Sequence, residues 1–262
     1  MKIETMNLIV NELNDVDNIK KMLMNYDNLS DESIKKILSS LKENNCNKYA
    51  FAIAVDSDVL ENRTLEEQIK LMEALKECDY NEYVCNIAIV PGVLENRTIE
   101  EQIKLMESLK ECDYNEYVCN IAIAPGVLEN RTLEEQIKLM ESLKECDYDE
   151  YACSIAIALY VLENRTIEEQ IKLMEALKEC DYNMDARDIA IAPDVLENRT
   201  VEEQIKLMEK KYNNKAIEIH KKNIEKINDL RKLKKYINKL KKIYGDETDI
   251  KLSGKVYYKQ DI

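Results

Sequence analysis

Residues 59–64 read Val-Leu-Glu-Asn-Arg-Thr, and the same six residues return at 93–98, 127–132, 161–166 and 195–200, always 34 residues apart. A fixed period of this length is typical of a stacked-repeat architecture. A single unit of this size cannot bury its own apolar side chains, so it has to cover them with neighbouring units. The period therefore predicts an elongated binding scaffold rather than an ordinary enzyme.

The residues after this hexapeptide predict a helix. In the second copy, Thr98 is followed three residues later by Glu101, which is the pattern of a capping box. Aliphatic side chains then recur at spacings of four and three residues, as they do on one face of a helix. We therefore expect a helix over residues 99–112, with Glu100 and Lys104 paired on its exposed side.

A second, shorter helix is expected in the other half of the unit. Residues 113–115 read Asp-Tyr-Asn, which favours a turn, and Asn115 can cap a helix over 116–123. The β-branched residues of this segment leave a strand open as the alternative, but residues 184–190 of the fourth copy do not alternate as a strand would. The Pro-Gly pair at 125–126 then ends the element, and one apolar turn leads to the next copy. The result is two helices and a connecting turn in each unit.

Both ends of the array depart from the repeat, as the end units of a stacked array must. Upstream, Ser30 stands in the register position of Thr64. Downstream, a lysine-rich helix favours a solvated cap, with a membrane-surface helix or a nucleic-acid arm as alternatives. The sequence predicts five segments: an N-terminal cap at 1–24, a degenerate first repeat at 25–58, the repeat array at 59–211, a basic capping helix at 212–245 that follows a turn at 212–214, and a tail or short hairpin at 246–262.

A 34-residue helix–turn–helix unit resembles the alpha-solenoid class of tetratricopeptide, pentatricopeptide and HEAT-type repeats. The succession Ile-Ala-Ile-Ala-Pro, a short apolar turn, a capped helix and Asp-Tyr-Asn is also similar to leucine-rich-repeat variants. The resemblance covers residues 29–211, but the Trp, Gly-Tyr and Pro positions of tetratricopeptide repeats are not matched, so no functional residue is carried over. It implies an all-α fold: a right-handed alpha-solenoid of about six helix–turn–helix repeats with N- and C-terminal caps, which binds its ligand in a curved groove.

The eight cysteines invite a catalytic or metal-binding interpretation, but their spacing argues against one. No Cys-x-x-Cys pair occurs, and His220 is the only histidine, so the spacing of a zinc site is missing. Free cysteine commonly behaves as a small buried apolar residue. Adjacent carboxylates such as Glu66 and Glu67 diverge on a helix and do not form an acid–base dyad. We expect no catalytic residue, no metal ligand and no cofactor.

Several features favour a cytoplasmic protein. The sequence contains no apolar run long enough to cross a bilayer, and its first residues lack the basic and apolar regions of a secretory signal. Asn-Arg-Thr matches a glycosylation acceptor in all five copies. The threonine is already accounted for as a helix cap, so we interpret the match as coincidental.

Charge is unevenly distributed along the chain, whose formal net charge is −14. Residues 59–194 carry 31 acidic and 13 basic side chains, a net charge of −18, whereas residues 209–244 carry 13 basic and 4 acidic ones, a net charge of +9. An acidic array repels nucleic acid along most of its length. It attracts basic surfaces, and this attraction weakens as salt is added.

Comparison among the copies indicates where a partner binds. First-helix positions barely vary, and the first position of the helix only exchanges aliphatic residues (Leu65, Ile99, Leu133, Ile167 and Val201), whereas substitutions collect in the second helix. A position that is needed for stacking has to stay fixed. Tyrosine recurs there in register and favours half-buried packing, but it is also a frequent interface residue. We therefore expect the partner on the second helices and the Pro-Gly junction, with an invariant Glu61–Arg63 ladder as the competing face. The candidate partner-binding residues are Glu82, Tyr83, Asn86, Glu116, Tyr117, Asn120, Glu150, Tyr151, Ser154, Asp185 and Arg187.

These features predict a non-enzymatic helical-repeat scaffold that binds a basic protein partner through an acidic groove. The alternative is an acidic inhibitor protein that mimics nucleic acid and blocks a nucleic-acid-binding enzyme. Modular reading of single-stranded nucleic acid, one base per repeat, is a third possibility that the net charge of −18 disfavours. No membrane contact is expected.

Overall fold

The computed structural model describes residues 29–45, 47–225, 232 and 235. Over those residues the chain forms sixteen helices, α3 to α18, and no strand. The predicted all-α class is therefore confirmed for this part of the chain, and the strand alternative for the second element of each copy is excluded.

Each copy contains three helices rather than the predicted two. The third is a six-residue α-helix where a single apolar turn was expected, because proline opens it in three of the four copies with a φ already suited to a helix and Val93 and Leu94 are buried beneath it. The bounds repeat from copy to copy: α6 (Leu65–Glu77), α7 (Glu82–Ile89) and α8 (Pro91–Asn96); α9 (Ile99–Glu111), α10 (Glu116–Ile123) and α11 (Pro125–Asn130); α12 (Leu133–Glu145), α13 (Glu150–Ile157) and α14 (Leu159–Asn164); α15 (Ile167–Glu179), α16 (Met184–Ile191) and α17 (Pro193–Asn198).

The degenerate first copy has the same three elements, α3 (Asp31–Glu43), α4 (Lys48–Val55) and α5 (Ser57–Asn62). Its first helix is capped by Ser30, whose side chain accepts a hydrogen bond from the Ser33 amide at 3.1 Å. The sequence prediction that Ser30 takes the role of Thr64 is thus confirmed. The predicted N-terminal cap at 1–24 lies outside the described residues.

At the other end, the predicted turn at 212–214 is wrong, because α18 (Val201–Glu225) runs through it without a break. The reason lies in the register of the repeat. Where the four full copies have Cys-Asp-Tyr followed by Asn or Asp, residues 214–217 read Asn-Lys-Ala-Ile, and lysine and alanine are good helix formers. Residues 212–225 of the predicted basic helix are helical, as are residues 232 and 235; the other residues between 226 and 245 and the tail at 246–262 lie outside the described residues.

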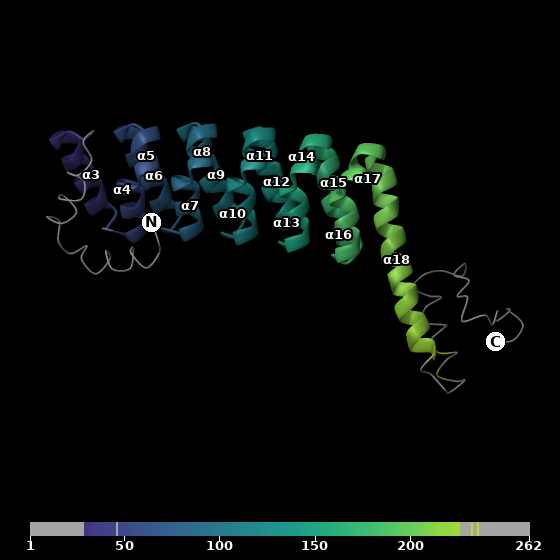
Figure 1. Ribbon diagram of the computed structural model, residues 1–262. Coiled ribbons are helices and arrows are strands. Elements are labelled where there is room, and N and C mark those ends of the chain that lie inside the picture. The colour runs from purple at the N-terminus through teal and green to yellow at the C-terminus, as the bar shows by residue number, and fades with distance from the viewer. Residues whose placement is uncertain (1–28, 46, 226–231, 233–234, 236–262) are drawn as a thin grey trace, which may run out of the picture.

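The helices stand in one row from α3 to α18, as Figure 1 shows. Equivalent helices of successive copies contact one another, so that each class forms its own line along the molecule. The first helices α6, α9, α12, α15 and α18 make one line, the second helices α4, α7, α10, α13 and α16 another, and the third helices α5, α8, α11, α14 and α17 the third. In Figure 1 the third helices lie at the upper edge and the second helices at the lower edge.

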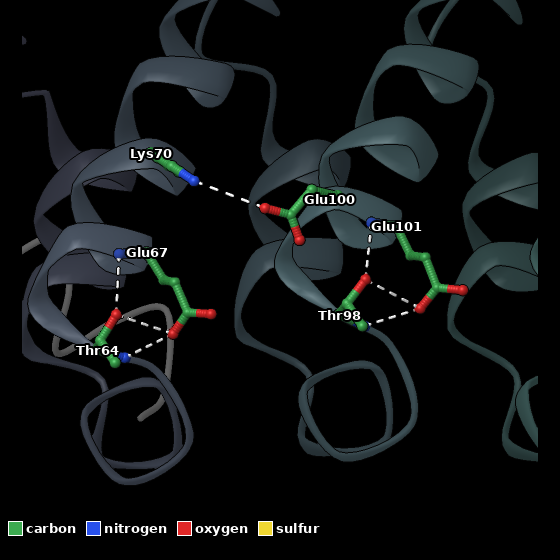
Figure 2. A network of polar contacts seen from close by, with 6 residues as sticks. All are labelled: Thr64, Glu67, Lys70, Thr98, Glu100 and Glu101. Atoms are coloured by element: carbon green, nitrogen blue, oxygen red, sulfur yellow. Dashed lines mark hydrogen bonds and ion pairs between the residues drawn. The ribbon is translucent and has the colours of Figure 1, made fainter.

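Two kinds of polar contact are made at the start of α9 (Figure 2). Thr98 accepts a hydrogen bond from the Glu101 amide at 3.3 Å, and the Glu101 carboxylate accepts one from the Thr98 amide at 2.9 Å, which confirms the predicted capping box. Glu100, which was expected to pair with Lys104, lies instead 3.6 Å from Lys70 of the preceding repeat. The ion pair therefore joins two copies rather than two turns of one helix.

The turn between the first and second helices uses an uncommon backbone. Asp147 and Tyr148 both have positive φ, 53° and 56°, a conformation that costs a non-glycine residue about 1 kcal/mol or more. Contacts from the next copy hold this turn: Tyr182 donates its hydroxyl to the Asp147 carboxylate at 3.1 Å, and Lys178 lies 3.2 Å from it. These two partners lower the pKa of Asp147. The same pair of residues has positive φ at 79–80, 113–114 and 181–182.

The cysteines line the junctions between copies. The seven that the structure describes are buried and unbridged, as the sequence indicated, and Cys46 lies outside the described residues. Cys85 donates to the Tyr49 carbonyl at 3.7 Å, and Cys119 donates to the Tyr83 carbonyl at 3.5 Å. Burial raises the pKa of Cys85, Cys119 and Cys153 to about 12, so these thiols stay protonated and poorly nucleophilic at neutral pH.

We expect alkaline pH to unfold the array through these thiols. A thiol whose pKa rises from 9.0 to about 12 on folding ionises first in the unfolded chain, so the free energy of unfolding should fall as pH increases from about 9 towards 12. Urea unfolding followed by circular dichroism at a series of pH values measures this slope. Replacing Cys85, Cys119 and Cys153 with alanine should flatten it; an unchanged slope in that variant would contradict the assignment.

Candidate partner-binding surface

The second helices place three of the candidate carboxylates in one line. Glu82, Glu116 and Glu150 are the first residues of α7, α10 and α13, and all three are exposed. Because these helices contact one another in succession, the carboxylates recur once per copy along the same edge of the molecule. The exposed Asn86 and Asn120 follow one helical turn later.

A tyrosine of the preceding copy donates a hydrogen bond to two of the three carboxylates. Tyr49 donates its hydroxyl to Glu82 at 3.1 Å, and Tyr83 donates to Glu116 at 3.3 Å. Desolvation and the Glu116 carboxylate both raise the pKa of Tyr83, and desolvation and Glu150 do the same to Tyr117. The tyrosine rings are half-buried against the core, as predicted. We call these repeated pairs the Tyr–Glu row.

The row changes where α16 begins. Met184 stands in the position of the glutamates and is 48% exposed, and the half-buried Asp185 replaces the tyrosine. Arg187 occupies the position of the buried cysteines, where its guanidinium lies 3.1 Å from Asp188 and 5.3 Å from the centre of the Tyr151 ring. The Arg187 Nε atom is buried without a hydrogen-bond partner, an arrangement that costs stability.

Two of the remaining candidates, Ser154 and Tyr151, are half-buried and contact other groups of the protein. Ser154 is half-buried and donates its hydroxyl to the Tyr151 carbonyl at 2.6 Å. Tyr151 itself lies beneath Arg187 rather than opposite a glutamate. The structure thus brings the candidates from Glu82 to Glu150 into one exposed row, and places Ser154, Asp185 and Arg187 at its more buried end.

The competing face contains an arginine that is committed to stacking. Arg131 donates to the Leu162 carbonyl at 3.0 Å, to the Arg165 carbonyl at 2.8 Å and to the Gln170 side chain at 3.2 Å, all in the next copy. Gln170 in turn donates to the carbonyls of Ile155 and Ala156, at the end of the second helix. Burial lowers the pKa of Arg131, whose side chain is largely covered.

This Arg–Gln ladder recurs through the array. Its members are Arg63 with Gln102, Arg97 with Gln136, Arg131 with Gln170 and Arg165 with Gln204. Only Glu61 of the proposed Glu61–Arg63 ladder is exposed to solvent, whereas Arg63 is half-buried and joins adjacent copies. The arginines therefore hold the repeats together, whereas Glu82, Glu116 and Glu150 of the Tyr–Glu row are exposed to solvent.

Replacing Arg131 with alanine should destabilise the fold by about 2–4 kcal/mol, because three buried acceptors lose their donor. Arg199 is the matched control. It stands in the same repeat position but is exposed, since the long helix α18 replaces the next copy. Its replacement with alanine should change stability by about 0.5 kcal/mol or less. Urea unfolding measures both variants, and equal losses would show that the ladder is not a principal source of stability.

The described residues hold no group of three or more His, Cys, Asp or Glu side chains placed to bind a metal ion. None of the helices in the described ranges is both long and apolar enough to cross a membrane. Comparisons of the chain with models of protein families, with curated proteins and with solved structures gave no match.

Sequence reasoning missed one surface feature. Ile157, Leu159 and Tyr160, at the end of α13 and the start of α14, are 37%, 50% and 51% exposed. A comparison among the copies could have found it, because residues 159–160 read Leu-Tyr where the third helix of two earlier copies begins with Pro-Gly. The predicted partner-binding face includes the Pro-Gly junction, but the prediction does not include the Leu-Tyr pair that replaces it in this copy.

Proposed function

We propose that this chain is a non-enzymatic scaffold, a right-handed alpha-solenoid of about six repeats, that binds a basic protein segment along its second helices. The observation that carries the proposal is the Tyr–Glu row. It presents one exposed carboxylate per copy at Glu82, Glu116 and Glu150, and the first two accept hydrogen bonds from the hydroxyls of Tyr49 and Tyr83. Fixed carboxylates beside aromatic rings suit a lysine or arginine side chain.

The spacing of the row favours an extended segment. Packed helices lie roughly 8–10 Å apart, and an extended chain advances about 3.3 Å per residue. One carboxylate per copy therefore matches a basic side chain at every third residue of the partner. The exposed Asn86 and Asn120 lie beside the row, where their side-chain amides can bond the partner's backbone.

The same spacing weighs against mimicry of nucleic acid. Double-stranded DNA carries one charge for about every 1.7 Å of its axis, far more than one carboxylate per helix spacing. The acidic-inhibitor alternative rests on the net charge of −18 over residues 59–194 and has no such ordered row in its support. Direct nucleic-acid binding is opposed by that charge.

The experiment uses a fluorescent peptide with lysine at every third residue and a second peptide of the same composition with its lysines adjacent. We expect the spaced peptide to bind more tightly, and replacement of Glu82, Glu116 and Glu150 with glutamine to weaken its binding about tenfold and reduce its salt dependence. Fluorescence anisotropy at low and high salt measures both effects.

The matched control replaces Glu73, Glu107 and Glu141 with glutamine, three exposed residues of the first helices. It removes the same number of charges from another face and should leave binding almost unchanged. Equal weakening by both triple variants would show that only the overall charge matters and would overturn the proposed face. Inhibition of a nuclease by the unaltered protein, lost in both variants, would support the alternative function.

A further inference from the structure

Exposed apolar surface is concentrated at one place in the array. Four large apolar side chains of the described residues are exposed, and three of them, Ile157, Leu159 and Tyr160, lie within four residues of one another. The fourth, Met184, opens α16. Scattered single apolar residues are normal on a protein surface, whereas a contiguous group marks a contact site.

Stacking does not require this group. The copies that contain α8 and α11 have Pro-Gly at the corresponding positions and form the same third helix, with proline in the favoured first position. A Cβ atom built on Gly126 would lie 3.2 Å from Leu162 and 3.6 Å from Leu159, so Leu159 lies close to the preceding third helix. The copy that contains α12–α14 therefore lacks the helix-starting proline and leaves half of the surface of Leu159 and of Tyr160 exposed, although the third helix also forms without them in the two preceding copies.

The rim of the group is acidic. Glu163 is exposed and lies one helical turn beyond Leu159 and Tyr160, on the same side of α14. The neighbouring third helices α11 and α17 contact α14 and carry the exposed Glu129 and Glu197. None of these three helices contains lysine or arginine. Arginine follows each helix only as its C-cap, at Arg131, Arg165 and Arg199, so the charges that the three helices themselves present beside the apolar centre are negative.

We propose that Ile157, Leu159 and Tyr160 form a docking surface for a partner segment in which a large apolar residue is flanked by lysine or arginine. The apolar residue covers the exposed leucine and tyrosine, and the flanking cations face Glu129, Glu163 and Glu197. An apolar anchor inside a charged rim is the usual arrangement of a specific interface.

This surface goes beyond the proposed binding along the second helices, because it fixes the register of the partner segment relative to the repeats. The first two full copies differ at three positions only, so a basic segment meets nearly equivalent carboxylates at each step and can shift by one repeat. An apolar site formed by Ile157, Leu159 and Tyr160 of one copy fixes which part of the partner lies at which repeat.

The test compares two labelled peptides of equal charge, acetyl-Lys-Lys-Leu-Phe-Lys-Lys-amide and acetyl-Lys-Lys-Gly-Ser-Lys-Lys-amide. The variant L159P/Y160G restores the Pro-Gly of residues 125–126, and L159S/Y160D introduces the Ser-Asp of residues 57–58. Both pairs occur naturally at this repeat position, so both variants should fold, which circular dichroism verifies. We expect the unaltered protein to bind the Leu-Phe peptide about tenfold more tightly than the Gly-Ser peptide, and both variants to lose this preference.

A preference that persists in both variants, or its absence from the unaltered protein, would overturn the proposal. So would dimerisation of the unaltered protein in sedimentation that L159P/Y160G abolishes, because the surface would then bind a second copy of the chain. The Glu82, Glu116 and Glu150 triple variant separates this inference from the proposed function. It should keep the Leu-Phe preference even if the Tyr–Glu row binds nothing.

Discussion

The structure depends on hydrogen bonds between copies, because the buried glutamine side chains of one copy are paired by groups of its neighbours. Each arginine of the Arg–Gln ladder donates to carbonyls of the next copy, and each glutamine donates to carbonyls at the end of the second helix of the preceding copy. The first, second and third helices are thereby tied to one another at every junction. A buried guanidinium is costly unless its donors are paired, so the ladder fixes the offset between copies as well as joining them. Apolar stacking alone would permit sliding.

This constraint divides the surface into two parts. Arginine, glutamine, cysteine and the turn tyrosines point into the junctions, where Cys85 and Tyr182 reach acceptors of the copy before them. What remains outside is a regular set of charges on the first helices, the Tyr–Glu row on the second and an acidic edge on the third. A partner can therefore distinguish one edge of the molecule from another by chemistry, although each edge repeats along its length.

Sequence patterns predicted the features that depend on neighbours along one helix. The capping box at Thr98 and Glu101 and the cap at Asn115 appear as expected, since each needs residues only two or three positions apart. The third helix escaped prediction because six residues are too few to show a helical period. The turn at 212–214 was inferred from its asparagines, but the Asp-Tyr pair that adopts positive φ in the other copies is absent there.

Contacts between copies were less accessible to sequence reasoning. Tyr83 and Glu116 are 33 residues apart, and Arg97 and Gln136 are 39 apart. No helical or strand period connects such positions, and the Glu100–Lys104 prediction failed because a partner in the preceding copy, Lys70, lies within reach. In a repeat protein, however, every such offset recurs. Charged and aromatic residues that stand in fixed register are therefore better paired with the adjacent copy than with their own helix.

The residues that depart from the repeat are the ones that distinguish one copy from another. Identical junctions have nearly identical energies, so an array of perfect copies gives a partner no reason to prefer one position. Met184, Arg187 and Tyr160 break the pattern within two adjacent copies, and each has a cost: exposed apolar surface in two cases and the unpartnered Arg187 Nε in the third. Substitutions that weaken the fold locally are hard to explain by stacking. Met184 and Arg187 lie at one end of the Tyr–Glu row, whereas Tyr160 lies in α14, on the edge formed by the third helices. Under the proposed function, these substitutions would supply selectivity for a partner, and the uniform copies before them would supply affinity.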